Sequence, residues 1–219
     1  MRRCPTIPRL QQNILERLAD VQYATNAQLA RWCKVQAPAI TKSVQQLLAD
    51  DLVDGSLLTR PMILHLTYAG GKLLNRPQPY GRRHASWSVM SHACHLNAVQ
   101  EAMLTSHAEF RFLTREGLFK EGLNPAFGEH GAVDGEGRAW FVLLDDYLMT
   151  SDRITRSWTR RHTPNLNYWP DHSGRAWCDV VHRFLVVCTD EHHAKRHREW
   201  ILKNRLPAEV MQLTRLWKT

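Results

Sequence analysis

Several acidic residues in the second half of the chain are placed where their carboxylates could bind a divalent cation. They lie beside predicted strands, in the order Glu116, Asp134 and Asp145, with Lys120 close to the first. Hard cations take oxygen ligands, and a bound Mg²⁺ or Mn²⁺ supports cleavage of phosphodiester bonds. One interpretation is therefore a nuclease site in which Asp134 and Asp145 are metal ligands for Mg²⁺ or Mn²⁺, and Glu116 and Lys120 assist catalysis.

The residues after Asp145 depart from the usual nuclease pattern. Restriction-endonuclease-like folds place an acid on one strand and an acid-x-Lys on the next, whereas Tyr147 stands two positions after Asp145. Asp145 and Asp146 could instead cap the following segment or pair with Arg153 and Arg156. We rank these structural roles above metal-dependent strand cleavage, which stays open.

A second metal candidate combines one thiol with imidazoles, at Cys188, His192, His193 and His197. His193 and His197 lie four residues apart on a predicted helix, a spacing compatible with zinc. The helix lacks the Glu that a metalloprotease needs after its first His. A structural zinc site is therefore less favoured than histidines without a metal.

Three arginines, Arg153, Arg156 and Arg160, recur at three and four residues within a predicted helix over residues 151–161. This spacing places them along one face, which suits a run of DNA phosphates. Ion pairs with Asp152 and neighbouring acids explain the spacing equally well. Both interpretations stay open.

The composition points to a globular protein with an anionic partner. Of the 219 residues, 43% are hydrophobic and 23% are charged, which excludes wholesale disorder. Lys and Arg number 29 against 21 Asp and Glu, a formal net charge of +8, so nucleic acid is the favoured partner class.

Cysteine usage and hydropathy indicate the compartment. The five cysteines are scattered and include no Cys-x-x-Cys pair, which argues against a disulfide framework. No apolar run approaches the roughly 18–20 residues that span a bilayer, so we expect no membrane partner. The expected location is the cytoplasm.

The elements of the first half follow from helical periodicity and capping signals. Apolar spacing predicts a first helix that ends near Asp20. Thr25 and Gln28 have the spacing of a capping box, which predicts a short second helix. Pro38 suits the first turn of a third helix that ends near Asp50.

Two short strands and a final helix should follow. The sequence predicts strands over residues 52–54 and 62–66, joined by a loop over residues 55–60, and Thr67 can cap a last helix. Three helices followed by a hairpin is the order of a winged helix-turn-helix. This half resembles winged-helix DNA-binding domains of bacterial regulators and plasmid proteins, in which a Leu-Thr-x-x-Gly sequence, here Leu66, Thr67 and Gly70, commonly follows the wing.

The outward face of the third helix has the chemistry of a DNA-reading surface. Its side chains are amides, hydroxyls and one cation, with no acid before Asp50, and the predicted DNA contacts are Thr41, Lys42, Gln45 and Gln46, with Arg60 in the wing. Amides and hydroxyls read base edges, whereas carboxylates repel phosphates. The alternative is a dimerisation or protein-docking module, which we favour less.

The second half should be a mixed α/β domain with a small central sheet. A helix is predicted over residues 87–107, strands over 110–114, 139–144 and 183–188, and helices over 151–161 and 190–203. The fold class is thus α+β, with a winged helix at 1–76, a linker at 77–86 and the mixed domain at 87–219. A degenerate restriction-endonuclease-like fold is one form of that domain.

The layout as a whole resembles the replication-relaxation and MobC-like mobilisation proteins of bacterial plasmids. The resemblance lies in the winged helix, in residues 95–99, and in the strand 140–145 followed by an Arg-bearing helix. It implies binding of double-stranded DNA at an origin of transfer or replication, with nicking in some members. Relaxosome or replication proteins and a second copy of the chain are compatible partners. The alternative function is a transcriptional regulator whose second domain senses a ligand or partner.

Overall fold

The computed structural model describes residues 7–55, 61–76, 86–113, 129–145, 150–152, 154–156, 181–214 and 216. The chain divides into two compact units, residues 1–97 together with 219, and residues 98–218. Among the described residues, no helix is both long and apolar enough to cross a membrane.

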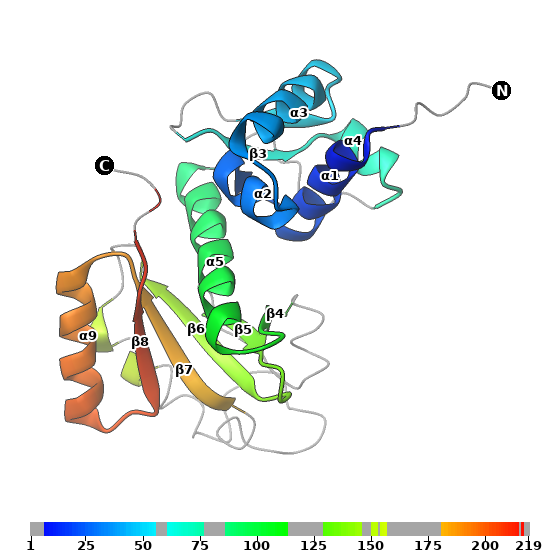
Figure 1. Cartoon of the computed structure of the whole chain (residues 1–219). Coiled ribbons are helices and arrows are strands. Elements are labelled where there is room, and N and C mark those ends of the chain that lie inside the picture. The colour runs from blue at the N-terminus through cyan, green and yellow to red at the C-terminus, as the bar shows by residue number, and fades with distance from the viewer. Residues whose placement is uncertain are drawn as a thin grey trace. The chain divides into compact units, whose positions relative to one another are not determined.

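The first unit contains a winged helix-turn-helix. Its elements are α1 (Arg9–Val21), β1 (Ala24–Thr25), α2 (Asn26–Cys33), α3 (Ala37–Ala49), β2 (Val53–Gly55), β3 (Ile63–Leu66) and α4 (Tyr68–Leu73) (Figure 1). The three strands pair in the order β1-β3-β2, and both pairings are antiparallel. The predicted helices and hairpin are confirmed, while β1 was not predicted.

Local capping explains where these helices begin. The Thr25 hydroxyl accepts from the backbone N–H of Gln28 at 3.3 Å, and the Gln28 side chain accepts from the Thr25 N–H at 3.0 Å, so the predicted capping box is present. Pro38 lies in the first turn of α3, where its missing N–H costs nothing. Thr67 caps α4 by accepting from the Gly70 N–H at 3.1 Å.

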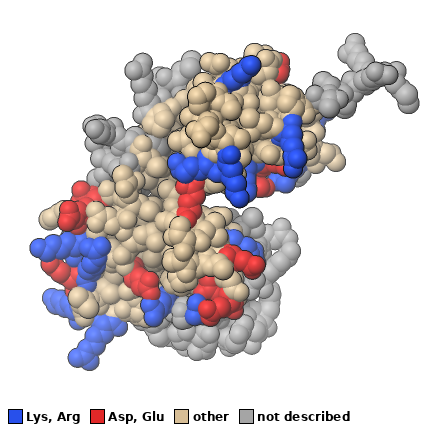
Figure 2. Space-filling view, viewed as in Figure 1, with Lys and Arg blue, Asp and Glu red and all other residues tan. Residues whose placement is uncertain are grey.

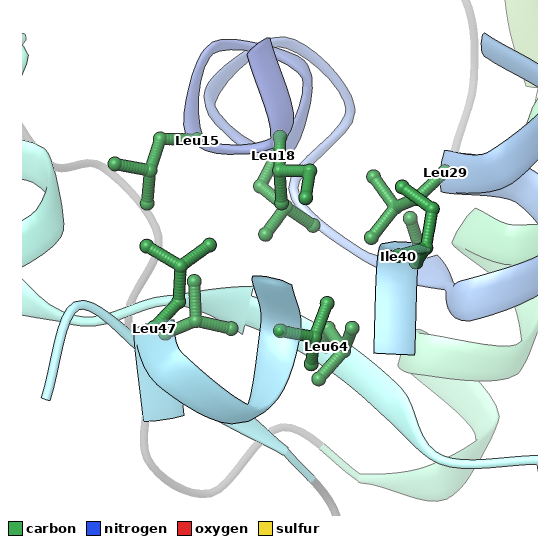
Figure 3. Packing of buried hydrophobic residues seen from close by; sticks show 10 residues of the cluster. Leu15, Leu18, Leu29, Ile40, Leu47 and Leu64 are labelled. Atoms are coloured by element: carbon green, nitrogen blue, oxygen red, sulfur yellow. The ribbon is translucent and has the colours of Figure 1, made fainter. Parts of the chain in front are cut away.

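A single apolar cluster holds α1, α2 and α3 against the strands. Leucines of the three helices meet Leu64 of β3 in Figure 3, and all are shielded from solvent. The labelled members are Leu15, Leu18, Leu29, Ile40, Leu47 and Leu64. Since these are the apolar positions of each helix, the opposite faces are left to solvent.

Gly70 allows α4 to approach the backbone that precedes β2. A Cβ at this position would lie 2.1 Å from the carbonyl oxygen of Leu52. The Leu52 carbonyl also accepts from the Thr67 N–H at 3.2 Å. The glycine of the Leu-Thr-x-x-Gly sequence is therefore required by close packing.

The long helix α5 (Trp87–Ser106) begins in the first unit. Within that unit, the Gln28 amide donates to the Cys94 carbonyl at 2.8 Å, and the Asn97 amide donates to the Tyr23 carbonyl at 2.8 Å. The mixed domain was predicted to start at residue 87, whereas the compact units divide after Asn97. These two hydrogen bonds explain the difference.

The second unit is built on a mixed five-stranded sheet. Its strands are β4 (Arg111–Phe112), β5 (Glu129–Val133), β6 (Ala139–Asp145), β7 (Val181–Cys188) and β8 (Ala208–Gln212), in the order β4-β5-β6-β7-β8. The pairs β4–β5 and β5–β6 are antiparallel, and β6–β7 and β7–β8 are parallel. The small central sheet is confirmed, and two of its strands, β5 and the edge strand β8, were not predicted.

Helix α9 (Glu191–Asn204) follows β7 directly and packs on β7 and β8 (Figure 1). Its N-cap is Asp190, whose side chain accepts from the His193 N–H at 3.1 Å. Every residue of β6 is buried, as the continuous apolar run predicted. The C-terminal ends of β6 and β7 therefore lie in the interior beside α9.

Candidate nucleic-acid interface and a buried histidine cluster

Helix α3 presents a polar face to solvent. Ile40, Val44 and Leu47 are its buried positions. The predicted contact residues lie on the remaining surface, and all four are exposed: Thr41, Lys42, Gln45 and Gln46. The helix is thus fixed by one face while the other is accessible within its own unit.

Two of these four side chains make hydrogen bonds within α3 or at its end. The Thr41 hydroxyl donates to the Ala37 carbonyl at 3.0 Å, and the Gln46 amide donates to the Asp50 carboxylate at 3.1 Å. Lys42 and Gln45 make no hydrogen bond or ion pair with another described residue. Lys42 and Gln45 are therefore the α3 groups readiest to contact an external ligand.

The other predicted DNA contacts receive little support from the described part of the chain. Arg60, Arg153 and Arg160 lie outside the described residues. Arg156 is helical and exposed, and its guanidinium pairs with Asp152 at 3.0 Å. This is the intramolecular pairing that the sequence offered as the alternative to a phosphate contact.

The basic run on α9 is a solvated helix face. Lys195, Arg196 and Arg198 are exposed, whereas His197, in the middle of the run, is fully buried. Figure 2 shows basic and acidic side chains interleaved over this helix. A mixed surface of this kind is typical of an exposed helix and offers no continuous phosphate track.

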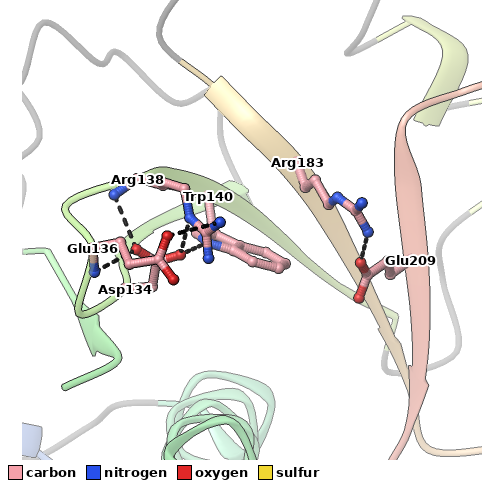
Figure 4. Close-up of polar contacts among 6 residues, drawn as sticks. All are labelled: Asp134, Glu136, Arg138, Trp140, Arg183 and Glu209. Atoms are coloured by element: carbon pink, nitrogen blue, oxygen red, sulfur yellow. Dashed lines mark hydrogen bonds and ion pairs between the residues drawn. The ribbon is translucent and has the colours of Figure 1, made fainter. Parts of the chain in front are cut away.

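Asp134 is held by the turn that joins β5 to β6. Its carboxylate accepts from the Arg138 guanidinium at 2.8 Å, the Trp140 indole N–H at 3.0 Å, and the backbone N–H groups of Glu136 and Arg138, each at 3.0 Å (Figure 4). The side chain is 2% exposed. Figure 4 also shows Arg183 of β7 pairing with Glu209 of β8.

These contacts give Asp134 a structural role. Burial alone raises the pKa of Asp134, but the hydrogen bonds from Trp140, Arg138 and Glu136 outweigh it and lower the pKa to about 2. Asp134 precedes β6 and Asp145 ends it, so the two carboxylates lie at opposite ends of one strand. The structure does not bring them to one metal ion, and the other predicted catalytic residues, Glu116 and Lys120, lie outside the described residues.

Asp145 instead meets two histidines of α9. Its Oδ2 lies 2.7 Å from Nε2 of His197 and 3.0 Å from Nδ1 of His193. The side chains of Asp145 and His197 are fully buried, and that of His193 is 21% exposed. Nδ1 of His197 lies 2.9 Å from the Ser151 hydroxyl.

Cys188 completes this cluster, which is termed the Asp145 cluster below: Asp145, Ser151, Cys188, His193 and His197. One ligand atom each of Asp145, Cys188 and His197 lies within 4.8 Å of the others. Burial and then the Asp145 charge raise the pKa of the Cys188 thiol to about 12. The sequence had suggested the thiol and the histidines as one group, but not that Asp145 and Ser151 join them.

Comparison with known proteins gives only remote likenesses. No protein-family model and no curated protein matches the chain. The adhesin competence repressor AdcR of Streptococcus pyogenes is 19% identical, over 52% of this chain and 74% of that one, with a TM-score of 0.30. ZitR of Lactococcus lactis in complex with DNA is 21% identical, over 46% of this chain and 73% of that one, with a TM-score of 0.30. RV1404 of Mycobacterium tuberculosis is 22% identical, over 45% of this chain and 74% of that one, with a TM-score of 0.31.

Structural similarity at these TM-scores gives no information about the function of this chain. The winged-helix fold of the first unit follows from the order and pairing of its own elements. The resemblance to replication-relaxation and MobC-like proteins finds no support in these comparisons.

Proposed function

We propose that this protein binds double-stranded DNA by placing α3 in the major groove, and that it acts as a transcriptional regulator. The observation that carries the proposal is the exposed face of Thr41, Lys42, Gln45 and Gln46 on a helix whose other face is buried. A recognition helix needs this division, because its apolar side must anchor it while its polar side reads base edges.

The chemistry of the face supports DNA in preference to a protein partner. Between Ile40 and Leu48 the exposed α3 side chains are all polar, and Lys42 supplies a cation without an acidic neighbour until Asp50. Protein interfaces are usually centred on buried aromatic or aliphatic residues. A side-chain amide such as that of Gln45 can form two hydrogen bonds to adenine.

We propose regulation in preference to DNA cleavage because the candidate carboxylates of the second unit do not converge on one point. Asp134 and Asp145, the two candidate metal ligands, lie at opposite ends of β6, and Asp145 contacts imidazoles. Metal-dependent nicking needs oxygen ligands that converge on one ion. Nicking with Mg²⁺ or Mn²⁺ stays a prediction: supercoiled plasmid should remain uncut if the protein is a regulator, and nicked circles that Asp145→Ala abolishes would support cleavage.

Selection of bound duplexes from fragmented genomic DNA of the source organism tests the role. A regulator should enrich promoter-proximal fragments, whereas a mobilisation protein should enrich an origin of transfer or replication. On the enriched site, Gln45→Ala should weaken binding by about 1–3 kcal/mol and relax the preference at one base pair. Gln12→Ala, an exposed amide change on α1, is the matched control and should leave binding unchanged. Equal binding of every duplex by the wild type and Gln45→Ala would contradict sequence-specific recognition.

A further inference from the structure

We propose that Asp145, Cys188, His193 and His197 bind one zinc ion, which fastens α9 to the ends of β6 and β7. The site is independent of the proposed DNA binding, because all four residues belong to the second unit. Three of the side chains have no exposure to solvent, and His193 is 21% exposed. A closed set of four ligands is typical of a structural zinc site.

The separations of three of the four ligand atoms, those of Asp145, Cys188 and His197, are close to the separations around one ion. Zinc lies about 2.0–2.3 Å from its ligands, so two ligand atoms of a tetrahedral site are about 3.3–3.8 Å apart. Oδ2 of Asp145 lies 2.7 Å from Nε2 of His197 and 3.0 Å from Nδ1 of His193. Sγ of Cys188 lies within 4.8 Å of the ligand atoms of Asp145 and His197. The ligand atoms of Asp145, Cys188 and His197 need shifts of about an ångström to admit the ion. His193 contacts Asp145 but lies outside this group of three, so its imidazole must move closer to Cys188 or His197 to become the fourth ligand.

The fold brings the four residues together from three elements. Asp145 and Cys188 are direct partners in the parallel pairing of β6 with β7, so the carboxylate and the thiol come from neighbouring strand ends. The chain turns at Asp190 and begins α9 at once. His193 and His197 are one helical turn apart, and both contact Asp145.

Ser151 orients His197 for metal binding. The Ser151 hydroxyl lies 2.9 Å from Nδ1 of His197, and Ser151 is itself buried. When Nδ1–H donates to this hydroxyl, the lone pair of Nε2 is directed toward Asp145. Such a second hydrogen bond on a ligating imidazole is a regular feature of zinc sites.

Charge and ligand type both favour zinc. A carboxylate and a thiolate together balance Zn²⁺, so the buried site is neutral when the imidazoles are neutral and the thiol proton has passed to solvent. Nitrogen and sulfur ligands suit zinc, whereas Mg²⁺ requires oxygen. The Asp145 cluster therefore differs in chemistry from the nuclease site that the sequence suggested.

Metal titration of the full chain, produced without a histidine tag and freed of metal, tests the proposal. We expect one tight Zn²⁺ per chain and a higher melting temperature with zinc. Co²⁺ should give the visible bands of a tetrahedral site and a near-ultraviolet sulfur-to-metal band. Cys188→Ser should remove the sulfur band, and His193→Ala should weaken zinc binding. Ser151→Ala should weaken it by roughly 10–100-fold, because that change affects orientation only.

Matched variants separate this site from the other histidines and thiols. His192→Ala alters the exposed neighbour of His193, and Cys94→Ser alters another buried thiol. Both should bind zinc as the wild type does. Failure of the folded wild type to bind zinc, or equal affinity in His193→Ala and His192→Ala, would overturn the proposal. If Cys188→Ser does not fold, zinc binding by His193→Ala, which alters a partly exposed residue, and the Co²⁺ spectrum of the wild type still test the proposal.

Discussion

The two units place their reactive side chains in opposite environments. In the first unit, the polar residues of α3 are exposed on a helix anchored by its apolar face. In the second unit, Asp145, Cys188 and His197 are buried where two strands end beside a helix. An exposed polar face depends on one helix, whereas a buried polar cluster depends on how three elements meet. Changes to packing should therefore affect the two differently.

The largest expected effect is loss of core packing, compared between the units. Phe141 in β6 and Leu47 in α3 are fully buried. Phe141→Ala should cost about 3–5 kcal/mol and Leu47→Ala about 2–5 kcal/mol, because each leaves a cavity. Hydrogen exchange of peptides should show the loss of protection mainly in the unit that carries the change. If both variants lost protection equally across β6–β7 and α1–α3, the two units would unfold together, which would contradict the expectation.

The second effect concerns close backbone packing in the winged helix. Gly70→Ala should destabilise the first unit by about 3 kcal/mol, because its Cβ would meet the Leu52 carbonyl oxygen at 2.1 Å. Gly137→Ala is the contrast: a Cβ there meets nothing within 4 Å, and only the positive φ of 75° opposes it. That strain is worth about 1 kcal/mol. Chemical denaturation of both variants tests the order, and equal costs would contradict it.

Asp134 gives the second unit a pH-dependent contribution. Its folded pKa of about 2 lies below the ordinary 3.8, so its stabilisation is present above about pH 4 and is lost as the pH falls toward 2. Asp134→Asn should therefore cost roughly 2 kcal/mol at neutral pH and much less near pH 2. Glu136→Gln, on the exposed side of the same turn, is the control. Unfolding curves that differ by a constant amount from pH 7 to pH 2 would exclude this role for Asp134.

The smallest stability effect expected is at the capping box of α2. Thr25→Ala removes the hydroxyl that accepts from the Gln28 N–H and should cost about 1 kcal/mol. Thr25→Ser keeps the oxygen and should restore most of that loss. The melting temperatures of the two variants provide the comparison, and identical values would show that the hydroxyl does not stabilise the helix.

Local signals allowed most of the first unit to be predicted. Thr25 with Gln28, Pro38 and Thr67 each act within a few residues, so the starts of α2, α3 and α4 could be recognised from the chain alone. Strand β1 escaped prediction because it has two residues and is defined only by its pairing with β3. The exposed face of α3 followed from helical periodicity.

The second unit was less predictable because its sites depend on pairings distant in sequence. The apolar runs predicted β6 and β7, but not the parallel register that sets Asp145 beside Cys188. The sequence suggested Asp134 as a metal ligand. Its hydrogen bonds with Arg138 and Trp140 could not be foreseen, because they depend on the shape of the turn between β5 and β6. The chemistry of an acid could be read from its residue type, but its partners could not.

The salt dependence of duplex DNA binding tests the central claim most directly. If Lys42 contacts a phosphate, Lys42→Ala should weaken binding and reduce the slope of log K against log[salt] by about 0.9. Lys203→Ala removes an equal charge from an exposed position on α9 and should leave the slope unchanged. A reduced slope in Lys42→Ala alone is the predicted result. Wild-type binding without salt dependence, or equal slopes for the wild type and Lys42→Ala, would contradict the placement of α3 against DNA.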